Sequence, residues 1–178
     1  MSVTFIERKV VHYEVFGRGQ PVIFLHSWLG SWRYWVPSME MISDRFRAYA
    51  MDFWGFGDSD GSVDEFTLDT YVEQLLGFMR ELGMVKANLV GHGLGGMVAV
   101  RAAMQSPNSF LKLIVTGMPV QGQVLANLTK GGALSRLMGR NSASEVMNKL
   151  MKQIQPKIAD QEILAELLED INNVDPDV

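Results

Sequence analysis

The chain has 178 residues, 47% of them hydrophobic and 20% charged, which is ordinary for a globular protein with its own core. Its formal net charge of −4 argues against binding to nucleic acid or an anionic membrane, because such proteins carry a basic patch. The lack of cysteine excludes disulfides, thiolate catalysis and cysteine-built metal sites. Its three histidines are scattered, which argues against a metal site built on histidine. No apolar run is long enough to span a membrane, and residues 1–4 lack signal-peptide features, so we expect a cytoplasmic protein.

Short apolar runs bounded by turn residues predict alternating strands and helices. Residues 3–8 and 10–16 are expected to form an N-terminal hairpin. Further strands are expected at 22–25, 48–52, 88–90 and 111–115. Helices are expected near 35–43, from a cap at Thr67 or Asp69 to about Leu82, and at 97–105. This alternation is typical of an α/β protein with a mostly parallel, doubly wound sheet.

The chain changes character after Pro119. Residues 120–178 show no strand pattern and predict two or three amphipathic helices, at roughly 123–138, 143–154 and 160–171. We therefore expect a core at 1–119 and a helical cap, or lid, at 120–178. The final segment, Asp175-Pro176-Asp177, is typical of a helix start, so the chain is expected to be truncated after the cap.

One glycine-rich turn connects a predicted strand to a predicted helix. Residues 91–95 spell Gly-His-Gly-Leu-Gly, directly after the apolar run at 88–90. This segment resembles the nucleophile elbow G-x-S-x-G of the α/β-hydrolase fold, with Gly93 where the serine belongs. Two more segments are similar to motifs of the same superfamily: Leu25 to Ser31 resembles the turn after its third strand, and Asp52 to Ser59 the loop after its fourth.

The resemblance covers residues 3 to about 118, and 120–178 corresponds to the superfamily's lid. It implies an incomplete α/β-hydrolase core, esterase-like chemistry without metal or cofactor, and an oxyanion hole formed by the backbone N–H groups of Leu94 and Trp28. Gly93 marks the position of the nucleophile. The side chains that the resemblance places against the substrate are His26, Ser27, Trp28, Trp54, His92 and Met118.

The chain lacks parts of the catalytic triad that this superfamily uses. Gly93 carries no nucleophile, and no histidine follows His92, although the order in the superfamily is Ser, then Asp or Glu, then His. We therefore expect this chain to be inactive. The glycine at position 93 is expected to keep the elbow's shape with a positive φ, and a small void is expected where the serine side chain would lie.

Several residues near these motifs have ordinary structural interpretations. His26 and His92 match positions that are structural in the superfamily, so neither is expected to act as the base. His12 is expected on the surface of a strand, and Asp52 is expected to anchor its own loop. The aromatic residues of the two loops favour pocket lining, with core packing beneath the lid as the alternative. They are Trp28, Trp32, Trp35, Phe53, Trp54 and Phe56.

Three interpretations of function stay open. The first is a fragment of a hydrolase for small apolar ester, lactone or acyl compounds, with its nucleophile replaced. The second is a pseudo-hydrolase that binds such a ligand as a receptor, and the third is a domain completed by another chain at an exposed sheet edge. Gly91, Gly93 and Gly96 also spell the dinucleotide fingerprint G-x-G-x-x-G, but they follow a late strand and no acidic residue ends the next one.

Overall fold

The computed structural model describes residues 2–28, 30–61, 66–118, 165 and 168–169. The chain divides after Met118 into two units, and every strand and helix given below lies in the first. The predicted cap helices at 123–138 and 143–154 lie outside the described residues. In the predicted helix at 160–171 only Ala165, Leu168 and Glu169 are described, each as helical.

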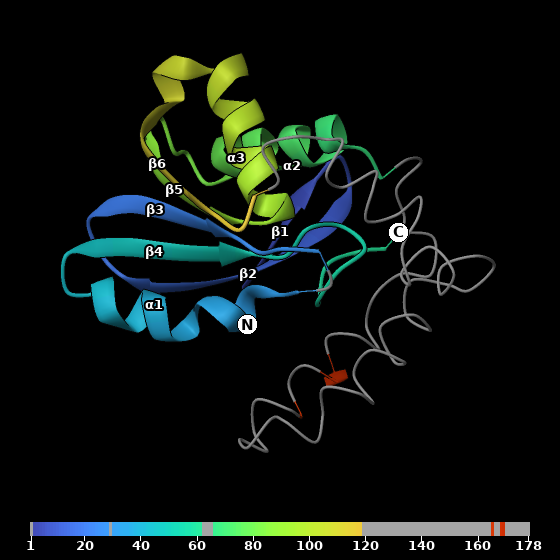
Figure 1. The fold of residues 1–178 in the computed structure, drawn as a ribbon, viewed down its shortest axis with the longest axis horizontal. Helices are drawn as coiled ribbons and strands as arrows, with labels where there is room; N and C mark the ends of the chain where they lie inside the picture. The colour runs from blue at the N-terminus through green and yellow to red at the C-terminus, as the bar shows by residue number, and fades with distance from the viewer. Residues whose placement is uncertain (1, 29, 62–65, 119–164, 166–167, 170–178) are drawn as a thin grey trace. The chain divides into compact units, whose positions relative to one another are not determined.

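Six strands and three α-helices form the first unit (Figure 1). The strands are β1 (Ser2–Ile6), β2 (Lys9–Gly17), β3 (Gln20–Leu25), β4 (Phe46–Met51), β5 (Ala87–His92) and β6 (Phe110–Thr116). The helices are α1 (Val36–Ile42), α2 (Leu68–Glu81) and α3 (Leu94–Gln105), with short 3-10 turns η1 (Trp32–Trp35) and η2 (Pro107–Ser109). None of the described helices has the length and apolar character needed to cross a bilayer.

The sheet is mixed, with the order β1-β2-β4-β3-β5-β6. Strands β1 and β2 form the predicted hairpin, and β2 runs antiparallel to β4. The pairs β3–β4, β3–β5 and β5–β6 are parallel, which confirms the mostly parallel sheet. Within the described sheet, β6 is an edge strand.

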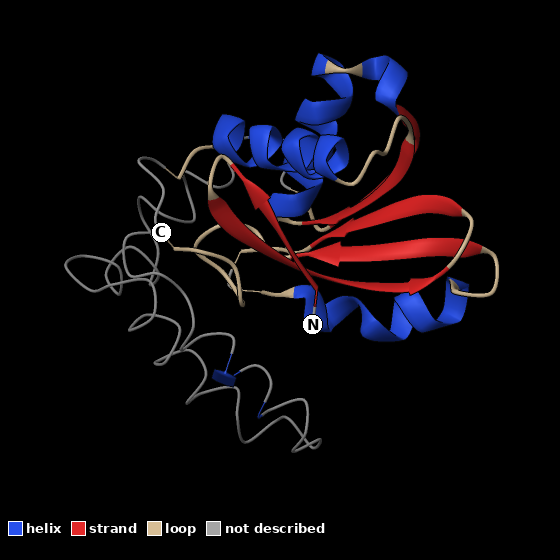
Figure 2. Ribbon diagram, turned by 180° about the vertical axis from the view of Figure 1, so that it is seen from behind, coloured by secondary structure: helices blue, strands red, loops and turns tan. Residues whose placement is uncertain are grey.

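The helices cover the two faces of the sheet separately. Figures 1 and 2 show α1 on one face and α2 and α3 together on the other, which confirms the doubly wound arrangement. On the α1 face, Met39 packs with Val22, Phe24, Ala48 and Ala50 in a buried cluster. Parallel strands that are covered on both faces have continuous apolar sequences, as β3 has at residues 22–25.

Local sequence signals account for the helix boundaries. The Thr67 hydroxyl accepts a hydrogen bond from the amide of Thr70 at 3.1 Å and caps α2, and Gly83 follows the helix with φ +66°. Helix α3 begins at Leu94, three residues before its predicted start. The glycine-rich turn is therefore shorter than expected, because only Gly93 separates β5 from α3.

Candidate active site

The turn between β5 and α3 has the backbone that the sequence predicted for an elbow. Gly93 has φ +54° and ψ −114°, and α3 starts at the next residue. The amide of Gly93 donates to the carbonyl of Thr116 at the end of β6, at 3.0 Å. A positive φ is rarely adopted by residues other than glycine, so the expectation for Gly93 is confirmed.

Close backbone approach explains the glycines on either side. A Cβ on Gly91 would overlap the carbonyl of Gly95, and a Cβ on Gly95 would overlap the carbonyl of Leu25 at the end of β3. The amide of Gly95 donates to the carbonyl of His26 at 3.0 Å. The first turn of α3 is therefore packed directly against the turn that follows β3.

The turn after β3 fills the space beside Gly93. A Cβ built on Gly93 would overlap the Ser27 Oγ and lie 2.9 Å from the Ser27 Cβ. The expected void beside the elbow is therefore wrong, because the side chain of Ser27 lies where a side chain on residue 93 would begin. Sequence reasoning missed this because the contact joins two motifs that are far apart in the chain.

His26 connects the loops that follow β3 and β4. Its side chain is fully buried, its Nδ1 lies 2.7 Å from the carbonyl of Ser27, and its Nε2 accepts the amide N–H of Phe53 at 2.9 Å. Since Nε2 is the acceptor, the ring proton lies on Nδ1 and donates to Ser27. Burial lowers the His26 pKa, against the opposing charge of Asp52. The imidazole is thus neutral and bridges two loops, and its predicted contact with substrate stays a prediction.

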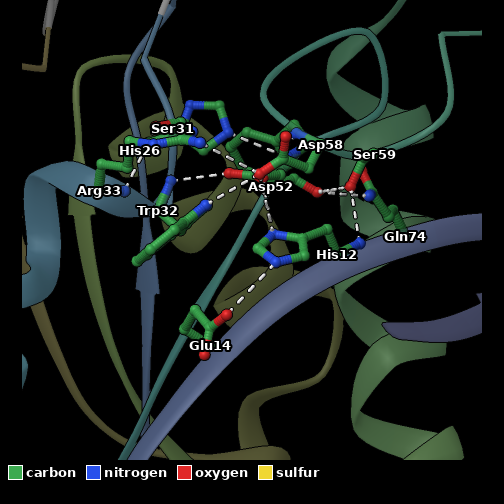
Figure 3. Close-up of polar contacts among 11 residues, drawn as sticks. His12, Glu14, His26, Ser31, Trp32, Arg33, Asp52, Asp58, Ser59 and Gln74 are labelled. Atoms are coloured by element: carbon green, nitrogen blue, oxygen red, sulfur yellow. Dashed lines mark hydrogen bonds and ion pairs between the residues drawn. The ribbon is translucent and has the colours of Figure 1, made fainter. Parts of the chain in front are cut away.

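Asp52 anchors the loops at this edge of the sheet (Figure 3). Its buried carboxylate accepts the amide N–H of Trp32 at 2.7 Å and that of Asp58 at 3.0 Å. Its backbone carbonyl accepts the Ser59 hydroxyl at 2.9 Å and the Gln74 side-chain amide at 3.0 Å. The sequence prediction of an anchoring role for Asp52 agrees with these contacts.

His12 is buried, so its predicted place on a strand surface is wrong. Its side chain is only 1% exposed, and its Nδ1 lies 3.0 Å from the Asp52 Oδ2. The loop after β4 covers this part of β2: the amide of His12 donates to Ser59 Oγ, and the amide of Val10 to Asp60 Oδ2. The alternation of apolar and polar residues along β2 could not predict this burial, because the residues that cover His12 lie about fifty positions further along the chain.

The negative charges around His12 act on its pKa in the opposite direction to its burial. Burial is the largest influence and lowers the His12 pKa, but the hydrogen bond and charge of Asp52, with the charges of Asp58 and Glu14, raise it above its ordinary value overall. The ligand atoms of His12, Asp52 and Asp58 lie within 4.8 Å of one another, as in some cation sites. Both oxygens of Asp52 already accept protein hydrogen bonds, so these contacts account for the cluster without an ion.

The remaining predicted substrate contacts fall into two groups. Trp54 is 2% exposed and lies in the core with Phe53 and Phe56, which supports packing as the role of these loop aromatics. Trp28 and His92 are exposed, and Ser27 and Met118 are half-buried. A Cβ on Gly117 would lie 2.7 Å from the His92 Nε2, and one on Gly96 would lie 3.3 Å from the Met118 Cβ. The carboxyl edge of the sheet therefore gathers Ser27, Gly93, His92 and Met118.

Comparison with known proteins gives the family. A sequence model described as "alpha/beta hydrolase fold" matches residues 20–143, which is most of the chain. The chain belongs to the α/β-hydrolase fold family. It is 34% identical over 110 residues to the putative carbamate hydrolase RutD of Agrobacterium fabrum, and 32% identical over 112 residues to epoxide hydrolase 4 of Mus musculus. These matches cover 59% and 61% of this chain but only 42% and 31% of the relatives, so the matched part spans less than half of each relative's length.

Solved structures show the same fold. An epoxide hydrolase from Bacillus megaterium, in complex with an inhibitor, superposes with a TM-score of 0.77 at 18% identity, over 97% of this chain and 67% of that one. The enol-lactonase from Burkholderia xenovorans LB400 superposes with a TM-score of 0.72 at 17% identity, over 99% of this chain and 69% of that one.

We expect Gly93→Ala to destabilise the hydrolase core more than Gly83→Ala. Both glycines have a positive φ, but a Cβ at Gly83 has no atom within 4 Å, whereas one at Gly93 would overlap Ser27. The strained backbone costs on the order of 1–3 kcal/mol at either position, and the overlap adds to it only at position 93. Thermal unfolding of both variants measures the difference. Equal losses of stability, or a gain at position 93, would contradict the tight packing of the elbow.

The two buried histidines should give opposite pH dependence. The pKa of His12 is raised in the folded protein. Protonated His12 therefore contributes its full stabilisation below about pH 6.5, the ordinary pKa of histidine. This contribution is lost as the pH rises through the raised pKa. A lowered pKa means that the contribution of neutral His26 is full above about pH 6.5 and is lost as the pH falls. Unfolding of His12→Gln and His26→Gln between pH 5 and pH 8 tests this.

The loss of melting temperature should be larger at pH 5 for His12→Gln and larger at pH 8 for His26→Gln. Each variant also loses a buried hydrogen bond, worth about 1–3 kcal/mol once the partner is left unsatisfied. That loss does not depend on pH, so it cancels when the effect of one variant at pH 5 is compared with the effect of the same variant at pH 8. Parallel pH profiles for the two variants would contradict the assigned charge states.

Proposed function

We propose that the chain derives from a hydrolase for small, largely apolar ester, acyl or lactone compounds, and that the 178-residue chain binds such a compound without cleaving it. The observation that carries this proposal is Gly93, which combines the backbone of a nucleophile elbow with the absence of any side chain. A cytoplasmic location and chemistry that needs no cofactor stay predictions. Relatives whose names refer to carbamate, epoxide and lactone substrates support a small ligand.

The proposed oxyanion site uses backbone N–H groups at the elbow. Leu94 is the first residue of α3, so its amide has no acceptor within the helix. The helix N-terminus also directs a positive partial charge to this point. By family resemblance, the amide of Trp28 is the second donor, and such paired donors stabilise the developing charge in acyl transfer. The proposed ligand contacts are Ser27, Trp28, His92 and Met118.

The absence of hydrolysis follows from the missing nucleophile and base. A serine hydroxyl reacts only when a base takes its proton. Both ring nitrogens of His26 bind backbone groups, and His12 is held by Asp52, so neither ring is free to serve the elbow. His92 is exposed at the end of β5, with no carboxylate among the described ion pairs to orient it.

A natural pseudo-hydrolase receptor is the second candidate function. The observation that favours it is the fit between Ser27 and Gly93, because the side chain of Ser27 takes the space that a nucleophile at position 93 would need. A site adapted to glycine in this way is consistent with a glycine in the native gene. A serine at position 93 in the full gene, with an acid and a histidine downstream, would instead favour the fragment of a hydrolase.

We expect the chain to hydrolyse p-nitrophenyl acetate at the buffer rate, and Gly93→Ser alone not to restore activity. A hydroxyl without a base stays protonated and weakly nucleophilic, and loss of a whole triad costs about 10⁶-fold in kcat. Stopped-flow release of p-nitrophenol measures both proteins. A stoichiometric burst with Gly93→Ser would show that a base reaches the elbow, with His92 the first candidate to replace by glutamine.

The exposed edge strand supports a further proposal, which concerns assembly. Every residue of β6 after Phe110 is exposed, with Ile114 60% and Leu111 48% accessible, although the segment is apolar. An edge of this kind presents unpaired N–H and C=O groups to other strands. We propose that β6 pairs with β6 of a second copy. A groove of about 680 Å³ beside it, lined in part by Val22, Phe24 and Ile114, adds apolar surface to the same region.

We expect the chain to associate in solution, and Ile114→Lys to weaken the association about tenfold or more by placing a charge on the edge. Val85→Lys is the matched control, since Val85 is 81% exposed but lies in the loop before β5. Sedimentation velocity over a range of concentrations gives the dissociation constants. A wild-type chain that stays monomeric, or equal effects of the two lysines, would contradict pairing through β6.

A further inference from the structure

Hydrogen bonds hold the backbone of Ser27, which lies two residues after the end of β3. Its carbonyl accepts hydrogen bonds from the amide of Gly30 at 3.1 Å and from the ring of His26 at 2.7 Å. The preceding residue is also held in place, because the carbonyl of His26 accepts a hydrogen bond from the amide of Gly95 in α3. The backbone of Ser27 is thus tied both to its own turn and, through His26, to the first turn of the elbow helix.

The side chain of this fixed residue points at Gly93. A Cβ on Gly93 would overlap the Ser27 Oγ, and would lie 2.9 Å from its Cβ and 3.7 Å from its Cα. The Ser27 hydroxyl therefore lies where the side chain of an elbow residue would start. Among the hydrogen bonds within the described part of the chain, none uses this hydroxyl, and the residue is only half-buried.

We propose that Ser27 supplies the ligand-binding hydroxyl of this site in place of the absent side chain at position 93. The hydroxyl donates a hydrogen bond to the carbonyl or ester oxygen of the bound compound, and its presence excludes a side chain on residue 93. The ligand role rests on the proposed function, whereas the exclusion of a side chain rests on packing alone.

The surroundings of Ser27 suit binding and not nucleophilic attack. The imidazole of the preceding residue, His26, uses Nδ1 to hold the Ser27 carbonyl and Nε2 to accept the Phe53 amide. Neither nitrogen of His26 is free to take the proton of the Ser27 hydroxyl, and a hydroxyl that no base serves stays neutral. A neutral hydroxyl donates one hydrogen bond and accepts others, as recognition of a carbonyl requires.

A double-mutant cycle tests the packing. Gly93→Ser should lower the melting temperature, and the loss should be about 2–4 °C smaller in a Ser27→Gly background, because the overlap is removed while the strain of the positive φ remains. Gly83→Ser, made with and without Ser27→Gly, is the matched control. There the losses of melting temperature from the two substitutions should add. Additive effects at position 93 would overturn the exclusion of a side chain by Ser27.

A binding measurement tests the hydroxyl. Phenyl butyrate, a small apolar ester, is titrated into the ¹⁵N-labelled chain and into Ser27→Ala, with amide shifts as the readout. Loss of one hydrogen bond should weaken binding about three- to tenfold. Equal affinities would overturn the ligand role of Ser27. Absence of binding to the wild-type chain would overturn the proposed function and the ligand role together, while the double-mutant cycle still decides the packing.

Discussion

The buried carboxylate of Asp52 joins three segments of the chain: strand β2, the 3-10 turn η1 and the loop after β4. A charge removed from water is costly unless hydrogen bonds and opposite charge replace its hydration. Here the amides of Trp32 and Asp58 and the ring of His12 supply those partners from η1, from the loop after β4 and from β2. The loop can close around the carboxylate only because residue 57 is glycine: a Cβ there would overlap the Asp52 carboxyl group, and its φ is +56°.

The candidate site depends on this anchor indirectly. Asp52 sets the course of the loop after β4, whose Phe53 amide fixes the ring of His26. His26 in turn holds the Ser27 carbonyl, and Ser27 lies against Gly93. A chain of hydrogen bonds and one packing contact thus runs from the middle of the sheet to the elbow. Each member is buried or half-buried, so the turn after β3 has little freedom to move relative to α3.

Sequence patterns predicted the features that neighbouring residues determine. The N-terminal hairpin, the end of α2 before Gly83 and the positive φ of Gly93 all depend on a few adjacent residues and were predicted, and the observed cap at Thr67 is one of the two predicted, Thr67 or Asp69. The motif comparison likewise predicted the hydrolase fold. The parts that failed depend on partners distant in sequence: the burial of His12 beneath Ser59 and Asp60, and the filling of the space beside Gly93 by Ser27. The cap helices lie outside the described residues and stay predictions.

The order of the strands also has a consequence for how the protein folds. Strand β5 pairs with β3 across a long stretch of chain, and the Asn88 side chain donates to the Pro21 carbonyl over a separation of 67 residues. Closing so large a loop costs conformational entropy before any contact repays it, whereas the β1–β2 hairpin closes over two residues. The elbow exists only where β3, β5 and α3 meet. Its geometry should therefore form late in folding, after the slowest of these pairings, and be lost early when the chain unfolds.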